Sequence, residues 1–210
     1  MTVLSQVDHL VVAADSLQQG VEWCEATLFV TPGAGGEHPL MGTHNRVVKI
    51  ATTDFSRAYL EIIAINPGAP DPRRRRWFDL DHPDLRRAIR QEPRLVHFVA
   101  SCQNPNEGSR ALHTLGIERG PMLSARRETA AGPLQWNISV RDDGQRLFHG
   151  VLPTLIEWGE RHPADSLPES GVSLVSVMAS HPRPDDLFSA YMSIGLKQVG
   201  VDAGAPNLAA

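Results

Sequence analysis

The feature that most constrains the fold of this chain is an internal repetition. Three segments share one pattern: a short apolar, β-branched run, then small or polar residues, then a stretch with helical spacing. They are VDHLVVAADSL from Val7, LVHFVASCQNP from Leu95 and LVSVMASHPRP from Leu174. Each segment predicts a strand, a turn and a helix. We therefore expect copies of one module that pair with each other.

The three predicted helices differ in how they end. They cover residues 16–28, 106–115 and 185–194, and their predicted N-caps are Asp15, Asn104 or Asn106, and Asp185. The second and third helices end at Gly116 and Gly195, where glycine offers the left-handed conformation of a C-cap. Phe29 stands at the corresponding place in the first copy. That helix must end differently or carry local strain.

Further strand candidates complete each module. They are RVVKIAT from Arg46, AYLEIIAI from Ala58, the residues around Met122, and residues 134–140 and 154–158. We expect GAGGEHPLMGTHN to be a loop and PGAPDPRRRRWFDLDHPD to be a linker. The predicted class is α+β, with paired βαβββ modules whose curved mixed sheets surround a central cavity, plus a partial third βα repeat. The expected boundaries are 1–70 for the first module, 71–92 for the linker, 93–165 for the second module, and 166–210 for the third repeat or a C-terminal extension.

Composition excludes several functional classes. The net charge of −4 gives no general attraction to nucleic acid or to anionic lipid. No apolar run approaches the ~18 residues of a membrane span, and no basic leader precedes one. Cys24 and Cys102 form no CxxC pair, so we expect neither a disulfide framework nor a structural zinc site. These observations predict a cytoplasmic protein with a small-molecule substrate.

Four ionisable residues lie inside otherwise apolar strands. They are His9 in VDHLVV, Glu61 in YLEIIAI, His97 in LVHFVA and Glu157 in TLIEW. A buried, unpaired carboxylate costs several kcal/mol, whereas two carboxylates and two imidazoles match the ligand set of a divalent cation. His9 and His97 occupy the same place in the repeated strand, and each glutamate lies in the last strand of its module. Pseudo-symmetry therefore predicts one metal held by all four; the alternative is four hydrogen-bonded core residues.

On the basis of these four residues and the repeated modules, the chain resembles the vicinal oxygen chelate superfamily from the first repeat to about residue 160. The segment GGEHPLMGTHN followed by YLEII looks like its glyoxalase-3-like branch. The resemblance implies paired βαβββ modules and His9, Glu61, His97 and Glu157 as ligands of one divalent metal, which would be zinc, nickel, manganese or iron. It also implies that a glutamate takes a proton from carbon and returns it nearby. Glu157 is the first candidate for that catalytic role and Glu61 the second.

The expected function is that of a metal-dependent, glyoxalase-like lyase or isomerase. It would act on a small oxygen-chelating substrate through a metal-stabilised enediolate. One alternative is a protein that binds or sequesters a small molecule. Another is an extradiol-type dioxygenase with His9, His97 and Glu157 around iron, although Glu61 would close a position that such an enzyme needs. The expected substrate contacts are His38, His44, Asn45 and Trp136. A homodimer is compatible with two modules, because modules of this superfamily pair within or between chains.

Overall fold

The computed structural model describes residues 3–129 and 132–210, and it contains the two expected modules. The first consists of β1 (Ser5–Ala13), α1 (Leu17–Leu28), β2 (Gly33–His38), β3 (Thr43–Lys49) and β4 (Tyr59–Ile65). The second consists of β5 (Arg94–Cys102), α3 (Pro105–His113), β6 (Met122–Arg127), β7 (Leu134–Ser139) and β8 (Thr154–Trp158). Helix α2 (Pro83–Gln91) connects them, and 3₁₀ turns η1 (Leu147–Gly150) and η2 (Pro163–Asp165) flank β8. The prediction of paired βαβββ modules is confirmed.

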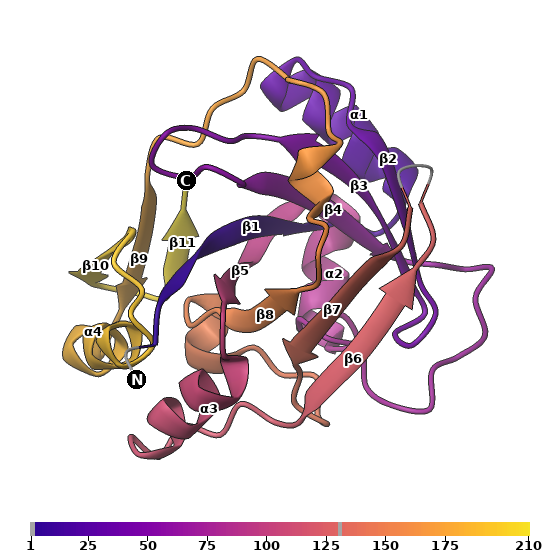
Figure 1. Ribbon diagram of the computed structural model, residues 1–210. Helices are drawn as coiled ribbons and strands as arrows, with labels where there is room; N and C mark the ends of the chain where they lie inside the picture. The colour runs from indigo at the N-terminus through magenta and orange to yellow at the C-terminus, as the bar shows by residue number, and fades with distance from the viewer. Residues whose placement is uncertain (1–2, 130–131) are drawn as a thin grey trace.

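The two modules share one eight-stranded mixed sheet in the order β2-β3-β4-β1-β5-β8-β7-β6. The first strands of the modules, β1 and β5, lie side by side and antiparallel at its centre, with Val11 opposite His97. Each first strand also runs parallel to the last strand of its own module, β4 or β8. The sheet curves strongly, so that the edge strands β2 and β6 approach each other (Figure 1). This curvature encloses an inner face.

Two apolar cores lie on the two faces of the sheet. The outer core packs under α1 and α3, where Gly20 lets α1 approach β4, since a Cβ there would lie 2.3 Å from Ile62. The inner core fills the concave side and includes Val11, Ile63 and Val99. Both faces of the central strands are therefore buried, which explains why their sequences are nearly continuous apolar runs.

The third repeat forms a small sheet of its own. Strands β9 (Val177–His181) and β10 (Val199–Ala203) run parallel around α4 (Pro184–Ser193), and β11 (Asn207–Ala209) adds antiparallel to β9. This unit lies beside the main sheet (Figure 1), where the Tyr191 hydroxyl donates to the carbonyl of Val151. Among the described residues, no helix is long and apolar enough to cross a membrane.

Several local expectations need correction. The glycine-rich segment is not all loop, because Gly33–His38 pairs with β3 as strand β2 through backbone bonds that need no side chain. The linker contains α2, whose buried Leu85 and Ile89 are four residues apart. Of the two expected outcomes at the end of α1, a different ending or local strain, the structure has the second: Phe29 itself takes the left-handed region, with φ 57, as Gly116 and Gly195 do.

The helix caps agree with expectation only in part. Asn104 caps α3 through its side chain, which accepts from the N–H of Glu107. Helix α1 is capped by Ser16 rather than Asp15, and Arg183 rather than Asp185 stands at the N-cap of α4. In each case the helix begins one or two residues away from the predicted position, which is the usual uncertainty at a helix end.

Candidate functional site

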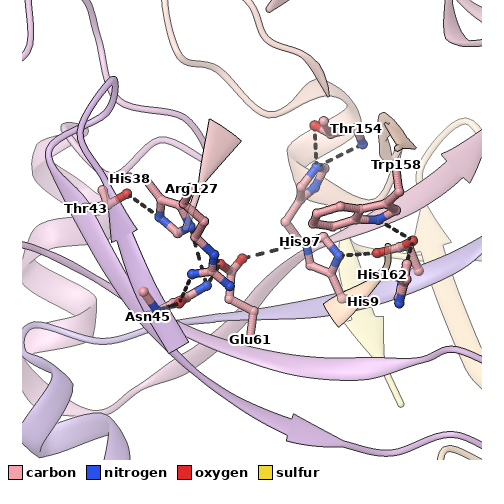
Figure 2. A network of polar contacts seen from close by, with 12 residues as sticks. His9, His38, Thr43, Asn45, Glu61, His97, Arg127, Thr154, Trp158 and His162 are labelled. Atoms are coloured by element: carbon pink, nitrogen blue, oxygen red, sulfur yellow. Dashed lines mark hydrogen bonds and ion pairs between the residues drawn. The ribbon is translucent and has the colours of Figure 1, made fainter. Parts of the chain in front are cut away.

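A narrow pocket opens on the inner face of the first module. Its polar lining comes from β1, β2, β3, β4 and β6, namely His9, His38, Asn45, Tyr59, Glu61 and Arg127. Its apolar walls are Val47, Trp77, Phe78, Trp136, Ile138, Ile156, Trp158 and Pro163. The free space measures about 30 Å³, so only a small group fits between the side chains as they stand. His9 and Glu61, two of the predicted ligands, face each other inside it (Figure 2).

His9 is held in one orientation by Asp8. The ring nitrogen Nδ1 lies 2.7 Å from Asp8 Oδ1, and the ring stacks on Tyr59 with centroids 4.5 Å apart. Burial alone would raise the pKa of the Asp8 carboxyl, but hydrogen bonds from His162 and His9 outweigh it and lower the pKa to about 2. An ionised carboxylate only accepts, so the proton of His9 sits on Nδ1. In the neutral imidazole, the Nε2 lone pair faces the pocket.

Asp8 reaches the inner face through a β-bulge. The register between β1 and β5 shifts between Val7 and His9, so Asp8 has no partner of its own and its side chain turns toward that of its neighbour. The indole N–H of Trp158 donates to Asp8 Oδ2 at 3.0 Å. His162 accepts the N–H of Ala164 on Nδ1 and therefore donates from Nε2 to the same oxygen, also at 3.0 Å. Three donors thus fix a carboxylate that is only 2% exposed.

Glu61 is fixed from the opposite side by Asn45. The Asn45 amide oxygen accepts the N–H of Gly36 at 2.8 Å, which directs its Nδ2–H to Glu61 Oε1 at 2.5 Å. The other oxygen, Oε2, lies 3.7 Å from His9 Nε2. When the His9 ring carries a proton on Nδ1 alone, two lone-pair atoms face each other across that gap. Such a pair repels unless a proton, a donor group or a cation lies between them.

Two further side chains complete the polar lining. Burial, followed by the charge of Arg127, lowers the pKa of His38 to about 3, so this ring is neutral at physiological pH. Arg127 reaches across from β6 to Asn45 Oδ1 at 3.5 Å (Figure 2). Within residues 3–129 and 132–210, no carboxylate forms an ion pair with Arg127. The pocket therefore contains one cation that is available to an anionic ligand.

The second module does not repeat this arrangement. His97 donates from Nδ1 to the carbonyl of Gly150 at 2.7 Å, because a carbonyl only accepts. Its Nε2 then accepts the backbone N–H of Thr154 at 3.1 Å and the Thr154 hydroxyl at 3.0 Å. Burial holds the pKa of His97 well below its ordinary value. The ring is neutral, its lone pair is used within the protein, and it does not line the pocket.

Glu157 lies on the other face of the sheet. In the first module, Glu61 pairs with Val11, two residues after His9; in the second, Val99, two residues after His97, pairs with Thr154. Thr154 therefore takes the place of Glu61. Glu157 follows three residues later, and an odd offset along a strand reverses the face. Its carboxylate accepts from Asn137 Nδ2 at 3.0 Å, outside the pocket.

The four predicted ligands therefore do not converge. Only His9 and Glu61 approach each other, while His97 and Glu157 have partners elsewhere. In the described part of the chain, no group of three or more His, Cys, Asp or Glu side chains is arranged to hold a metal ion. The donor set expected for one divalent cation does not fit this geometry, and neither does the triad expected for an extradiol dioxygenase.

The predicted substrate contacts divide in the same way. His38, Asn45 and Trp136 line the pocket, whereas His44 alternates to the other face of β3 and does not. If the protein binds a small molecule, the sequence predicts Trp23, Trp77, Trp136 and Trp158 as aromatic walls, and all but Trp23 line the pocket. Sequence reasoning missed Asp8, Tyr59 and Arg127 as parts of the site. An acidic residue beside His9 in an apolar strand was a usable signal. The bulge that brings the Asp8 side chain to the same face could not be predicted, because regular alternation along a strand would place neighbouring residues on opposite faces.

A family model and one solved structure support the fold. The glyoxalase-like domain family matches residues 7–195. A hypothetical protein from Staphylococcus aureus has a similar structure, with TM-score 0.62, 13% identity, and coverage of 97% of this chain and 88% of that one. A methylmalonyl-CoA epimerase from Streptomyces coelicolor aligns with TM-score 0.45 and 18% identity over 75% of this chain and 96% of its own. No curated protein sequence matches this chain.

Proposed function

This chain belongs to the family of glyoxalase-like domains, and on that premise we propose that it is an enzyme that transfers a proton on a small carbonyl compound. The groups that exchange the proton are His9 and Glu61. The observation that carries the proposal is the pair of opposed acceptors, Nε2 and Oε2, 3.7 Å apart in a buried pocket, each held by a separate partner. Two bases positioned in this way suit removal and return of a proton.

The roles of the two groups follow from their partners. His9 takes the proton from carbon, because the Asp8 carboxylate behind its ring stabilises the imidazolium that forms. Glu61 takes the proton of a neighbouring substrate hydroxyl through its free oxygen, Oε2, and passes it to the former carbonyl oxygen, so that the hydroxyl becomes the new carbonyl. His9 then returns its proton to the carbon that carried the first carbonyl. This is an isomerase reaction that uses the residues of the chain itself.

The substrate class follows from the walls and the charge of the pocket. Trp77, Trp136 and Trp158 exclude water, which strengthens every electrostatic interaction inside. Arg127 supplies a positive charge with no carboxylate partner in the described part of the chain. It suits the carboxylate of a substrate or the negative charge that develops on an enolate. We therefore propose a small α-hydroxy aldehyde or ketone that carries an anionic group.

The test needs no knowledge of the net reaction. A panel of small hydroxy acids, keto acids and hydroxy aldehydes is incubated with the protein in D₂O, and proton NMR records the loss of the C–H signal beside the carbonyl. The wild-type protein is expected to exchange at least one compound. Glu61→Gln and His9→Gln are expected to lower that rate by about a hundredfold or more.

Glu157→Gln is the matched control, because it changes the same residue type on the opposite face of the sheet. It should exchange at the wild-type rate. If Glu61→Gln and Glu157→Gln lower the rate equally, the assignment of Glu61 is wrong.

A second candidate function is binding without chemistry, which the aromatic walls of the pocket favour. A compound that binds in this way raises the melting temperature of the protein and exchanges no hydrogen. The same panel therefore distinguishes the two functions.

A further inference from the structure

A buried arginine without a partner lies outside the candidate site. Arg119, in the loop between α3 and β6, is only 5% exposed. Its Nε has no hydrogen-bond partner among the described residues, and no carboxylate there forms an ion pair with its guanidinium. Burial, followed by the charge of Arg141, lowers its pKa to about 9. The group is therefore still protonated at neutral pH, and an uncompensated buried charge is strongly unfavourable.

The arginine borders a small cavity that is separate from the polar part of the candidate site. Arg141 and Arg146 also line this cavity, but each already has a carboxylate: Arg141 Nη2 lies 2.6 Å from Asp143, and Arg146 Nε lies 2.8 Å from Asp79. Three arginines thus line one space, and two of them form ion pairs with carboxylates. The remaining positive charge belongs to Arg119.

A second orphan donor borders the same cavity. Trp77 is 6% exposed, and its indole N–H has no hydrogen-bond partner among the described residues. Its ring lies between this cavity and the candidate site, since it lines both. A buried N–H without an acceptor costs about 1–3 kcal/mol. Two side chains that border this cavity therefore each carry an N–H without an acceptor among the described residues.

A glycine forms part of the cavity wall. At Gly144, with φ +71, a Cβ would lie 2.1 Å from the carbonyl oxygen of Arg76. This position brings two backbone segments into direct contact beside the space. The space itself measures about 10 Å³, which is close to one water-sized sphere.

We infer that this cavity is a binding site for a monatomic anion of the size of chloride, held by Arg119 and by the indole N–H of Trp77. An anion supplies both missing acceptors and neutralises the charge, whereas a water molecule supplies hydrogen bonds only. The small free space, about 10 Å³, favours a monatomic anion over phosphate or sulfate. The anion stabilises the junction of the second module with the segment that carries Trp77, and it takes no part in the proton transfer.

The experiment measures thermal unfolding of the full-length protein in sodium chloride and in sodium gluconate at equal ionic strength. The melting temperature of the wild-type protein should rise by several degrees with chloride concentration and not with gluconate. Arg119→Met keeps a side chain of similar length without the charge. Its melting temperature should be the same in both salts. Arg73→Met, which removes an exposed arginine, should keep the chloride response.

A second measurement does not depend on the variant folding. Crystals of the wild-type protein soaked in bromide should show an anomalous peak inside the cavity, between Arg119 and Trp77. The inference is overturned by an equal chloride response in Arg119→Met, by no difference between chloride and gluconate in the wild-type protein, or by a cavity that contains no bromide.

Discussion

Replacement of Asp8 by asparagine separates the charge of this side chain from its size. Asp8 accepts hydrogen bonds from His9, Trp158 and His162, and all three arrive as donors. An asparagine offers one oxygen and one NH₂ group, so at least one of the three donors loses its acceptor. The imidazole of His9 can also change tautomer and accept from the new amide. Its Nε2 would then carry the proton, and the base facing Glu61 would be lost.

The magnitude follows from the pKa of Asp8. The difference between the ordinary value of 3.8 and about 2 in the folded protein corresponds to about 2 kcal/mol of folding free energy. Because the pKa is lowered on folding, this stability is fully present above about pH 4. It disappears as the pH falls toward 2, where the folded protein also takes up the proton.

Urea unfolding of both proteins at a series of pH values measures this effect. At neutral pH, Asp8→Asn should be less stable than wild type by about 2 kcal/mol or more. The difference should shrink as the pH falls below about 4. Hydrogen exchange into substrate should fall by at least about a hundredfold, because the tautomer of His9 is no longer fixed. A stability difference that does not change with pH, or an unchanged exchange rate, would refute the reasoning.

Three other substitutions test separate parts of the site. Arg127→Met should raise the concentration of an anionic substrate needed for half-maximal exchange by about tenfold or more, measured in the D₂O assay, and should leave a neutral analogue unaffected. Gly35→Ala should lower the melting temperature by several degrees, because the new Cβ would lie 2.2 Å from the backbone oxygen of Asn45 and push away the residue that orients Glu61. Thr154→Val should cost about 1 kcal/mol in urea unfolding, since His97 keeps the backbone N–H of residue 154 as a donor; its exchange rate should equal that of wild type.

The repeated strand–turn–helix pattern was enough to predict the fold class, because each copy carries the hydrophobic period of its elements. The prediction from this pattern failed for elements whose side chains carry no hydrophobic period. Strand β2 is rich in glycine and is held by backbone pairing with β3. Its sequence therefore shows no alternation of apolar residues that would predict a strand. Helix α2 lies in a segment dominated by proline and arginine, and only Leu85 and Ile89 mark its buried side.

The candidate site could also be predicted only in part. His9 and Glu61 could be predicted, because an ionisable residue inside an apolar strand signals a special environment. Glu157 carried the same signal, yet the parallel register of β5 with β8 puts Thr154 in the equivalent position and turns Glu157 outward. The bulge at Asp8 also depends on pairing with β5. Register is a property of two strands together, and neither strand reveals it alone.

The central claim is that Asp8 holds His9 with its proton on Nδ1 and its Nε2 lone pair toward Glu61. Long-range proton–nitrogen NMR of histidine-labelled protein at mildly alkaline pH, where free histidine is neutral, measures the tautomer of each ring directly. We predict a protonated Nδ1 and an unprotonated Nε2 for His9, with the assignment made by comparison with His9→Gln. A proton on Nε2 of His9 in the wild-type protein would contradict the claim.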